Sequence, residues 1–435
     1  MTRNTLLAAL AIAFSTAVQA QTEIQWWHSM GGALGDKVNE LANKFNDSQK
    51  DYKVVPSFKG TYPESMTAAI AAFRAGNAPH ILQVFEVGTA TMMSAKGAIV
   101  PVYKLMKDAD EPFNSKAYLG PVSGYYTDPK GQMLSFPFNS STVVLYVNKD
   151  AFKKAGLDPN KAPKTWKDVV AASEKLKASG QACAYTTSWP SWVHVENMSA
   201  WHNVPIGTKE NGMAGTDTEF RINSPLHVKH WSMVSDLAKR GMFSYAGRTN
   251  QGGAKFSSGE CAMLTESTGA QANIRREAKF EWSVNPMPYW DDVAGAPQNA
   301  IIGGASLWVM SGKTNNAYKG VAKFFAFLSR PEVQMDWHTS TGYVPITIAA
   351  YEMTKKAGFY DKNPGAEVAI KELMNKPPTS NSKGLRFGNF VQGRSVIEEE
   401  FEAMVSGKKD AKTALDDAVR RGNEVLRKFE SSNKS

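Results

Sequence analysis

Short apolar strands alternate with amphipathic helices from residue 22 onward, and this alternation limits the fold more than any other feature of the sequence. Five segments carry the first part of the pattern, with strands at 22–28, 52–58 and 81–85 and helices at 34–45 and 64–75. The helix at 64–75 is expected to turn Met66, Ile70 and Phe73 inward, and to end at Gly76. Strands and helices of this length form βαβ units, which predict an α/β fold with a parallel sheet.

The same alternation returns in the second half of the chain. It predicts a strand at 142–147, a helix at 149–156, a helix at 166–179 with Thr165 as its N-cap, a strand at 301–310, and helices at 317–328 and 413–429. No internal repeat, low-complexity tract or Pro/Ser-rich linker divides the sequence. A chain of 435 residues exceeds what one hydrophobic core usually serves, so we expect two α/β lobes that the chain joins by several short crossings. Ligands of such proteins bind between the lobes, at the carboxyl ends of strands.

The first twenty residues have the pattern of a secretory signal peptide. Arg3 supplies positive charge, the apolar run at 6–14 is about half of the ~20 residues that span a bilayer, and Ala17–Ala20 offers small residues for a peptidase. We expect cleavage after Ala20, in preference to a membrane anchor or an ordinary helix. The remaining chain is predicted to be exported and soluble.

The formal charge of +9 favours an anionic partner. The basic residues are spread along the chain and form no nucleic-acid recognition motif. Nucleic acid is therefore not expected as a partner, while a small anion remains possible.

The chain contains two cysteines, Cys183 and Cys261, separated by 78 residues. An exported protein can join such a pair in a disulfide, or keep both as buried thiols, and the spacing does not decide between these. No Cys-x-x-Cys motif suggests redox chemistry or zinc.

The sequence carries no recognisable catalytic apparatus. It lacks Gly-x-Ser-x-Gly, the P-loop, the dinucleotide fingerprint and His-Glu-x-x-His. His227 and His230 are expected on a solvated helix face, and Glu398–Glu400 on a charged helix surface. His194-Val195-Glu196 resembles half of a deaminase signature whose Pro-Cys-x-x-Cys partner is missing. The chain is predicted not to be an enzyme and to use no metal and no cofactor.

Aromatic, hydroxyl and carboxylate side chains recur where predicted loops adjoin strands and helices. These are Tyr62 at a helix start, Glu86 after an apolar strand, the hydroxyls of 138–142, Trp189 and Trp192 in a proline-containing loop, the hydroxyls of 265–270 that lead into a helix, and Tyr343 in a turn. Each feature alone is more often structural than functional. Together they predict a binding site for a polyol or sugar, because such a ligand needs aromatic planes, a carboxylate and several neutral donors.

Long segments of the sequence resemble a known family. They are Trp-His-Ser-Met at 27–30, Ala-Ala-Phe-Arg-Ala-Gly-Asn-Ala-Pro at 71–79, Glu-Val-Gly-Thr-Ala-Thr-Met-Met at 86–93, Pro-Phe-Asn-Ser-Ser-Thr at 137–142, Asn-Ala-Ile-Ile-Gly-Gly-Ala-Ser-Leu-Trp-Val-Met at 299–310, and Thr-Gly-Tyr-Val-Pro-Ile-Thr at 341–347. These segments are similar to those of the periplasmic glycerol-3-phosphate receptors of ABC importers, a branch of the solute-binding family that includes the maltose-binding proteins. The resemblance covers essentially the whole chain after the signal peptide.

The resemblance implies a type II periplasmic binding protein fold with three hinge crossings. It places 21–137 and 304–345 in lobe I, and 138–303 and 346–435 in lobe II. It implies that sn-glycerol 3-phosphate, and glycerophosphodiesters such as glycerophosphocholine, bind in the cleft in the periplasm. The partners would be the ABC permease subunits of the inner membrane with their ATPase.

The resemblance also implies a ligand set. Tyr62, Glu86 and Trp189 would face the glycerol part, and the phosphate contacts would be Ser141, Ser267, the backbone of Gly304, Tyr343 and Arg394. Trp192 is a weaker candidate from the loop of Trp189. Glu266 departs from what is expected beside a phosphate, unless its side chain points away.

Two other functions are alternatives to that of a transport receptor. An exported phosphodiesterase or phosphatase would need a metal cluster or a nucleophile with its base, and neither pattern is found. A sugar receptor of the same fold would not need an arginine at the phosphate end.

Overall fold

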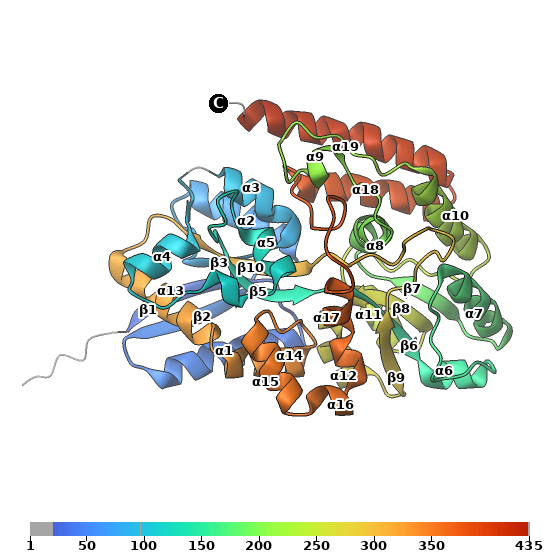
Figure 1. Ribbon diagram of the computed structural model, residues 1–435, viewed down its shortest axis with the longest axis horizontal. Helices are drawn as coiled ribbons and strands as arrows, with labels where there is room; N and C mark the ends of the chain where they lie inside the picture. Colours follow the sequence, from blue (N-terminus) through green and yellow to red (C-terminus); the bar gives the residue numbers. More distant parts are fainter. Residues whose placement is uncertain (1–20, 96, 434–435) are drawn as a thin grey trace, which may run out of the picture.

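The computed structural model describes residues 21–95 and 97–433. The predicted signal peptide at 1–20 lies outside these residues. Figure 1 shows two β-sheets side by side, with helices packed around each of them. The chain therefore has the two-lobed α/β architecture that the strand–helix alternation predicts.

Lobe I is built on a six-stranded mixed sheet. Its strands are β1 (Thr22–His28), β2 (Tyr52–Phe58), β3 (Ile81–Phe85), β4 (Ile99–Val100), β5 (Phe136–Ser141) and β10 (Gly303–Met310). The order is β2-β1-β3-β10-β4, with β5 also paired to β10. β1 runs parallel to β2 and β3, whereas β10 runs antiparallel to β3, β4 and β5.

Helices cover both faces of this sheet. They are α1 (Ala33–Ser48), α2 (Tyr62–Arg74), α3 (Thr89–Ser94), α4 (Val102–Asp108), α5 (Gly120–Tyr126), α13 (Asn315–Leu328) and α14 (Pro331–Thr341). After residue 345, α15 (Ile348–Lys356) packs on α14, and α16 (Phe359–Lys362) packs on α15. α2 begins at a capping box in which the Thr61 and Glu64 side chains each accept from the other's backbone N–H. The prediction that Ile70 and Phe73 face inward is wrong, because Ser65, Met66 and Ala69 form the buried face of α2.

Lobe II is built on a four-stranded sheet of order β7-β8-β6-β9. The strands are β6 (Val143–Asn148), β7 (Cys183–Thr187), β8 (Cys261–Ser267) and β9 (Trp282–Pro286). Its helices are α6 (Lys149–Lys154), α7 (Trp166–Ala178), a π-helix at Trp192–Asn197, α8 (Met198–Trp201), α9 (Thr208–Asn211), α10 (Pro225–Lys239), α11 (Gly252–Ser257), α12 (Gln271–Glu277), α17 (Val368–Leu373), α18 (Phe390–Val405) and α19 (Ala411–Asn433). Thr165 caps α7 as predicted, and Asp168 completes a capping box.

The two C-terminal helices bury residues that were expected at the surface. α18 and α19 pack on each other and against α10, and Figure 1 shows α19 along the top of the molecule. His227 and His230 of α10 are consequently fully buried, so the prediction of a solvated face is wrong. Glu398 and Glu400 are also buried, although Glu399 is more exposed.

The chain crosses between the sheets where β5 gives way to β6. Ser141 still pairs with β10 and Val143 already pairs with β8, so the first crossing lies at Thr142. A boundary after residue 137 would divide β5, and we propose Thr142 in its place. The second crossing lies between Pro286, the last residue of β9, and Gly303, the first residue of β10. The boundary after residue 303 remains a prediction.

Glu372 of α17 connects these two crossings. Its carboxylate accepts hydrogen bonds from the Thr142 hydroxyl at 2.8 Å and from the Met287 backbone N–H at 2.7 Å. Its backbone carbonyl accepts from the N–H of Ala300 at 3.1 Å. One buried residue thus binds both segments that link the lobes.

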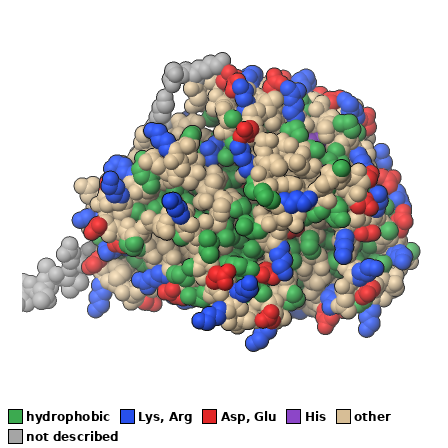
Figure 2. Space-filling model, viewed as in Figure 1, with side chains coloured by type: hydrophobic (Ala, Val, Ile, Leu, Met, Phe, Trp, Pro, Cys, Tyr) green, Lys and Arg blue, Asp and Glu red, His purple; other side chains and the backbone are tan. Residues whose placement is uncertain are grey.

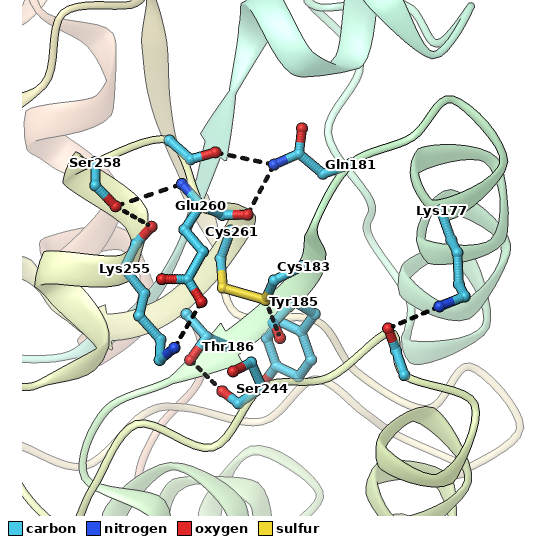
Figure 3. The surroundings of a disulfide bond; sticks show 12 residues. Lys177, Gln181, Cys183, Tyr185, Thr186, Ser244, Lys255, Ser258, Glu260 and Cys261 are labelled. Atoms are coloured by element: carbon cyan, nitrogen blue, oxygen red, sulfur yellow. Dashed lines mark hydrogen bonds and ion pairs between the residues drawn. A yellow bond between two sulfur atoms is a disulfide. The ribbon is translucent and has the colours of Figure 1, made fainter.

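Cys183 and Cys261 form a disulfide within lobe II (Figure 3). They are the first residues of the parallel strands β7 and β8, and they lie opposite each other in the register. The sequence alone did not decide whether this disulfide forms, because only the pairing of β7 with β8 brings the two thiols together.

Lysine and arginine side chains are scattered over the face shown in Figure 2 and do not gather into one basic patch there. Among the helices of residues 21–95 and 97–433, none is long and apolar enough to cross a membrane.

Candidate functional site

A cavity of about 430 Å³ lies between the two lobes. All eight residues of the predicted ligand set line it, and so does Trp192: Tyr62, Glu86, Ser141, Trp189, Ser267, Gly304, Tyr343 and Arg394. Tyr62, Glu86, Ser141, Gly304 and Tyr343 come from lobe I, and the tryptophans, Ser267 and Arg394 come from lobe II. The structure brings the whole set together, and the contact of each residue with a ligand remains a prediction.

Strand direction explains how residues distant in sequence meet here. Ser141 and Ser267 are the last residues of β5 and β8, and Glu86 directly follows β3. Gly304 lies at the beginning of β10, which runs antiparallel to β3 and β5 and so starts where they end. The cavity therefore lies at the carboxyl ends of strands from both sheets.

Gly304 allows the strands to approach closely at the cavity. Its φ is +94°, and a Cβ at this position would lie 1.9 Å from the backbone oxygen of Asn139. Only glycine fits such a position without displacing the neighbouring strand. Gly304 thus lets β10 lie close against β5 at the edge of the cavity.

Aromatic rings form one wall. The Tyr62 ring stacks on Phe85 at a centroid distance of 5.1 Å, and Trp189 lies 6.3 Å from Tyr62. The Tyr62 hydroxyl accepts a hydrogen bond from Asn139 Nδ2 at 3.1 Å. Trp189 has a φ of +50°, in the left-handed region that is uncommon for a tryptophan, and its backbone N–H donates to Thr249. These contacts fix two flat apolar surfaces against the cavity.

Arg394 is held by two carboxylates. Its Nη2 lies 2.6 Å from Glu86 Oε1 and 2.7 Å from Glu196 Oε2, and its Nε lies 2.9 Å from Glu196 Oε1. All three side chains are buried. Burial alone would lower the pKa of Arg394, but the two carboxylates overcome this and raise it. Burial raises the pKa of Glu86, and Arg394 opposes that rise.

This triad defines the charge that Arg394 presents to the cavity. Its hydrogen bonds through Nε and Nη2 go to carboxylates, and the triad as a whole carries one negative charge when all three groups are ionised. The charge of Arg394 is therefore already compensated by two carboxylates, and its contact with a phosphate remains a prediction. Only Nη1 has no hydrogen bond among the described residues.

Glu196 was missed by the sequence analysis. It lies on the π-helix at Trp192–Asn197, and the Ser191 hydroxyl donates to its Oε1 at 3.0 Å. Its pairing with Arg394 spans 198 residues of sequence. In the sequence, Glu196 stands out only as part of His194-Val195-Glu196, which resembles half of an unrelated deaminase signature.

Neutral groups line the part of the cavity away from the triad. Ser267 Oγ accepts from the backbone N–H of Gly269 at 3.0 Å and keeps its own proton for another partner. Trp192 Nε1 is buried without a hydrogen bond among the described residues. Tyr343 stacks on Trp337 at 5.9 Å, which holds its ring in place. A ligand rich in acceptor oxygens would match these donors.

Glu266 is among the residues that line the cavity, and its carboxyl interacts with Tyr343 and Trp189 of the same lining. It is 1% exposed, and its Oε1 accepts from the Ser267 backbone N–H at 2.8 Å. Its Oε2 has no hydrogen bond among the described residues. Burial raises the pKa of Glu266 to about 7, although Ser188, Ser267 and Trp189 oppose this.

No group of three or more His, Cys, Asp and Glu side chains that could hold a metal ion occurs within residues 21–95 and 97–433. The buried His194 and His230 contact each other at 2.9 Å and otherwise contact aromatic and hydroxyl groups. Burial lowers the pKa of His194 to about 3. These rings are therefore neutral parts of the lobe II core near pH 7.

Comparisons with known proteins find a family and relatives that agree with each other. The family described as "Bacterial extracellular solute-binding protein" matches residues 40–368. The "sn-glycerol-3-phosphate-binding periplasmic protein UgpB" of Yersinia enterocolitica is 54% identical over 433 residues, which cover 99% of this chain and 98% of that protein. The UgpB of Salmonella typhimurium is 53% identical over 435 residues, covering 100% of this chain and 99% of that protein.

Solved structures share the fold. UgpB from Mycobacterium tuberculosis in complex with glycerophosphocholine superposes with a TM-score of 0.79 at 20% identity, covering 94% of this chain and 99% of that one. The maltose-bound MalE3 of T. maritima gives a TM-score of 0.76 at 17% identity, covering 93% and 99%. Both confirm the two-lobed binding-protein fold.

Proposed function

We infer the function from the premise that this chain belongs to the family of bacterial extracellular solute-binding proteins. We propose that it is an extracytoplasmic receptor that captures sn-glycerol 3-phosphate, and glycerophosphodiesters such as glycerophosphocholine, for uptake by an ABC transporter. Its location would be the periplasm, and its partners the permease subunits of the inner membrane with their ATPase. It would bind and release its ligand without changing it.

One observation carries the proposal. The residues matched from the glycerol-phosphate receptors are spread from Tyr62 to Arg394 in sequence, and all of them line one interlobe cavity. Relatives that are 53–54% identical over nearly the full chain carry the name of sn-glycerol-3-phosphate-binding proteins. The donors and aromatic surfaces of the cavity suit a small polyol phosphate.

The cavity divides into two ends by chemistry. We propose that Glu86 and Arg394 bind the hydroxyls of glycerol, because a carboxylate accepts from vicinal hydroxyls and the arginine keeps Nη1 for an oxygen. Trp189 and Tyr62 would cover the carbon skeleton. The phosphate would lie at Ser141, Ser267, Tyr343 and the backbone of Gly304, where neutral donors meet.

Titration calorimetry at pH 7 with glycerol 3-phosphate, glycerophosphocholine and maltose tests this function. We expect saturable heat with both glycerol phosphates, none with maltose, and unchanged ligand in the ³¹P NMR spectrum afterwards. The absence of heat with either glycerol phosphate would overturn the proposal, and release of phosphate would favour an esterase.

The serines provide a local test of the phosphate end. Ser141→Ala and Ser267→Ala should each weaken binding by about 1.5–3 kcal/mol, the range for a hydrogen bond to a charged group. The exposed Ser258→Ala is the matched control and should leave the Kd unchanged. Equal affinities for all four proteins would remove these hydroxyls from the site.

A further inference from the structure

Glu266 is a carboxyl group in a place where the proposed function requires an anion to bind. It is the residue before Ser267, lines the same cavity, and is nearly inaccessible to solvent. Its Oε1 is held by the backbone N–H of Ser267, while Oε2 has no hydrogen bond among the described residues. Among the described residues, the Ser188 hydroxyl is also buried without a hydrogen-bond partner. Neither this hydroxyl nor the Trp189 indole forms a hydrogen bond of good geometry with Glu266 Oε2.

The charges around the cavity do not compensate this carboxyl. The described lining contains the cations Arg276 and Arg394 and the carboxylates Glu86, Glu266 and Glu277. Arg394 is already paired with Glu86 and Glu196, and Arg276 lies at the exposed mouth beside Asp36 and Glu277. Within residues 21–95 and 97–433, Glu266 therefore has no cation of its own.

The neighbouring elements present only neutral groups to Glu266. The titratable side chains that interact with it are the phenols of Tyr343, from the turn after α14, and Tyr146, from β6. The loop after β7 adds Ser188 and Trp189, and the turn after β8 adds backbone N–H groups. Burial without a counter-charge raises the pKa of Glu266 to about 7, so its proton is exchanged near neutral pH.

A phosphate monoester and a phosphate diester differ in charge in this pH range. The monoester loses its second proton near pH 6 and is then dianionic, whereas the diester keeps a single negative charge. Two unit charges a few ångströms apart in a protein interior interact by several kcal/mol at an effective dielectric constant of about 20. An ionised Glu266 therefore opposes the monoester more strongly than the diester, and a protonated Glu266 can donate to either.

We propose that Glu266 is a specificity determinant that selects the ligand by the charge of its phosphate, favouring the monoanionic diester over the dianionic monoester. Binding of the monoester is coupled to uptake of a proton by Glu266. This inference rests on the proposed function, since it concerns the choice between two glycerol phosphate classes in one cavity.

Calorimetry of the full chain at pH 7.0 and 8.5 tests the inference with glycerol 3-phosphate, glycerophosphocholine and glycerophosphoglycerol. The last compound is a diester without a cationic head group, so it separates the charge of the phosphate from attraction of choline. For the wild type, the affinity for glycerol 3-phosphate should fall more steeply with pH than the affinity for either diester.

The variant Glu266→Gln keeps an acceptor for the Ser267 N–H and removes the charge. At pH 8.5 it should bind glycerol 3-phosphate at least about tenfold more tightly than the wild type, and change the diesters by about threefold or less. Glu281→Gln removes the same charge from an exposed position in lobe II and should change neither affinity. A ratio of monoester to diester affinity that is the same in the wild type and Glu266→Gln would overturn the inference.

Two further outcomes are decisive. One is that the wild type favours glycerophosphocholine over glycerol 3-phosphate without favouring glycerophosphoglycerol. In that case the carboxyl acts on the choline head group, and the inference is wrong. If Glu266→Gln does not fold, titrations of the wild type with glycerol 3-phosphate in two buffers of different ionisation enthalpy still measure the proton uptake, and no uptake at pH 8 overturns the inference. Failure of the wild type to bind any glycerol phosphate would instead overturn the proposed function.

Discussion

At the scale of single residues, Arg394 contributes both to the stability of the fold and to the binding cavity. It pairs with Glu86 and Glu196 in a buried triad, and it lines the cavity. Removing one partner of a buried ion pair leaves an uncompensated charge away from water, which costs about 3–5 kcal/mol. Stability and binding are therefore coupled at this position.

Arg394→Ala should lower the free energy of unfolding by about 3–5 kcal/mol and also weaken ligand binding. Urea denaturation and calorimetry measure the two effects. Arg240 is the matched control, because it also pairs with two carboxylates, Glu174 and Asp236, but at the surface. Arg240→Ala should change stability by less than about 1 kcal/mol. Equal stabilities of the two variants would contradict the burial argument.

The sequence predicted the members of the site better than their arrangement. Glu86 was predictable because it follows an apolar strand, and strand ends converge at one edge of a sheet. Ser267 was predicted only among the hydroxyls that lead into a helix, and its strand β8 was not. The partners of Arg394 were not, because Glu196 lies 198 residues away in sequence and meets it only through the packing of α18. The orientation of Glu266 was not predictable either, since alternation along β8 does not say which face borders the cleft.

At the scale of elements, the periodicity of apolar residues predicted the positions of the helices well. It predicted their buried faces less well. α1 buries Leu34, Val38 and Phe45 as expected, because only one side of it meets the sheet. α10 was misjudged because α18 and α19, which follow more than 150 residues later, cover its second side. A helix covered on two sides needs more buried positions than a single apolar stripe reveals.

Glu372 joins two hinge crossings and gives them a dependence on pH. Burial raises its pKa to about 8 in the folded chain, above the ordinary value of 4.5. The folded state therefore favours the protonated form, and this contribution to stability is full below about pH 4.5 and is lost as the pH rises toward 8. Other buried groups also titrate in this range, so a comparison of variants isolates Glu372.

Glu372→Gln imitates the protonated form and should gain stability relative to the wild type as the pH rises from 5 to 8. The expected difference at pH 8 is on the order of 3 kcal/mol. Urea denaturation at pH 5, 6.5 and 8 measures it, with the exposed Glu332→Gln as the control. A stability difference that does not change with pH would show that Glu372 is ionised in the folded protein.

At the scale of the whole molecule, one lobe caps a helix of the other. α1 begins after Gly32, which has no side chain to cap it, and the N–H of Ala33 donates to Asn273 Oδ1 at 2.9 Å. Asn273 lies on α12 of lobe II, and Arg276 from the same helix lies 3.4 Å from Asp36 of α1. These contacts join the two lobes directly.

Asn273→Ala should weaken ligand binding about fivefold, because an N-cap contributes about 1 kcal/mol and acts here on the closed state alone. Calorimetry measures the affinity, and small-angle scattering should show that saturating ligand compacts the wild type. Lys279→Ala, at an exposed position just after α12, is the control. An unchanged affinity for Asn273→Ala would mean that the cap is also satisfied in the open state.

The bond between Cys183 and Cys261 finally bears on the order in which the molecule is assembled. Lobe II is completed by α18 and α19, whose residues are made more than a hundred positions after Cys261. The bond joins the first residues of β7 and β8, which lie opposite each other in register, and both strands precede α18 and α19 in the sequence. Oxidation can therefore join β7 to β8 covalently when α7, α10 and α11 are already present in the chain, before α18 and α19 complete the lobe.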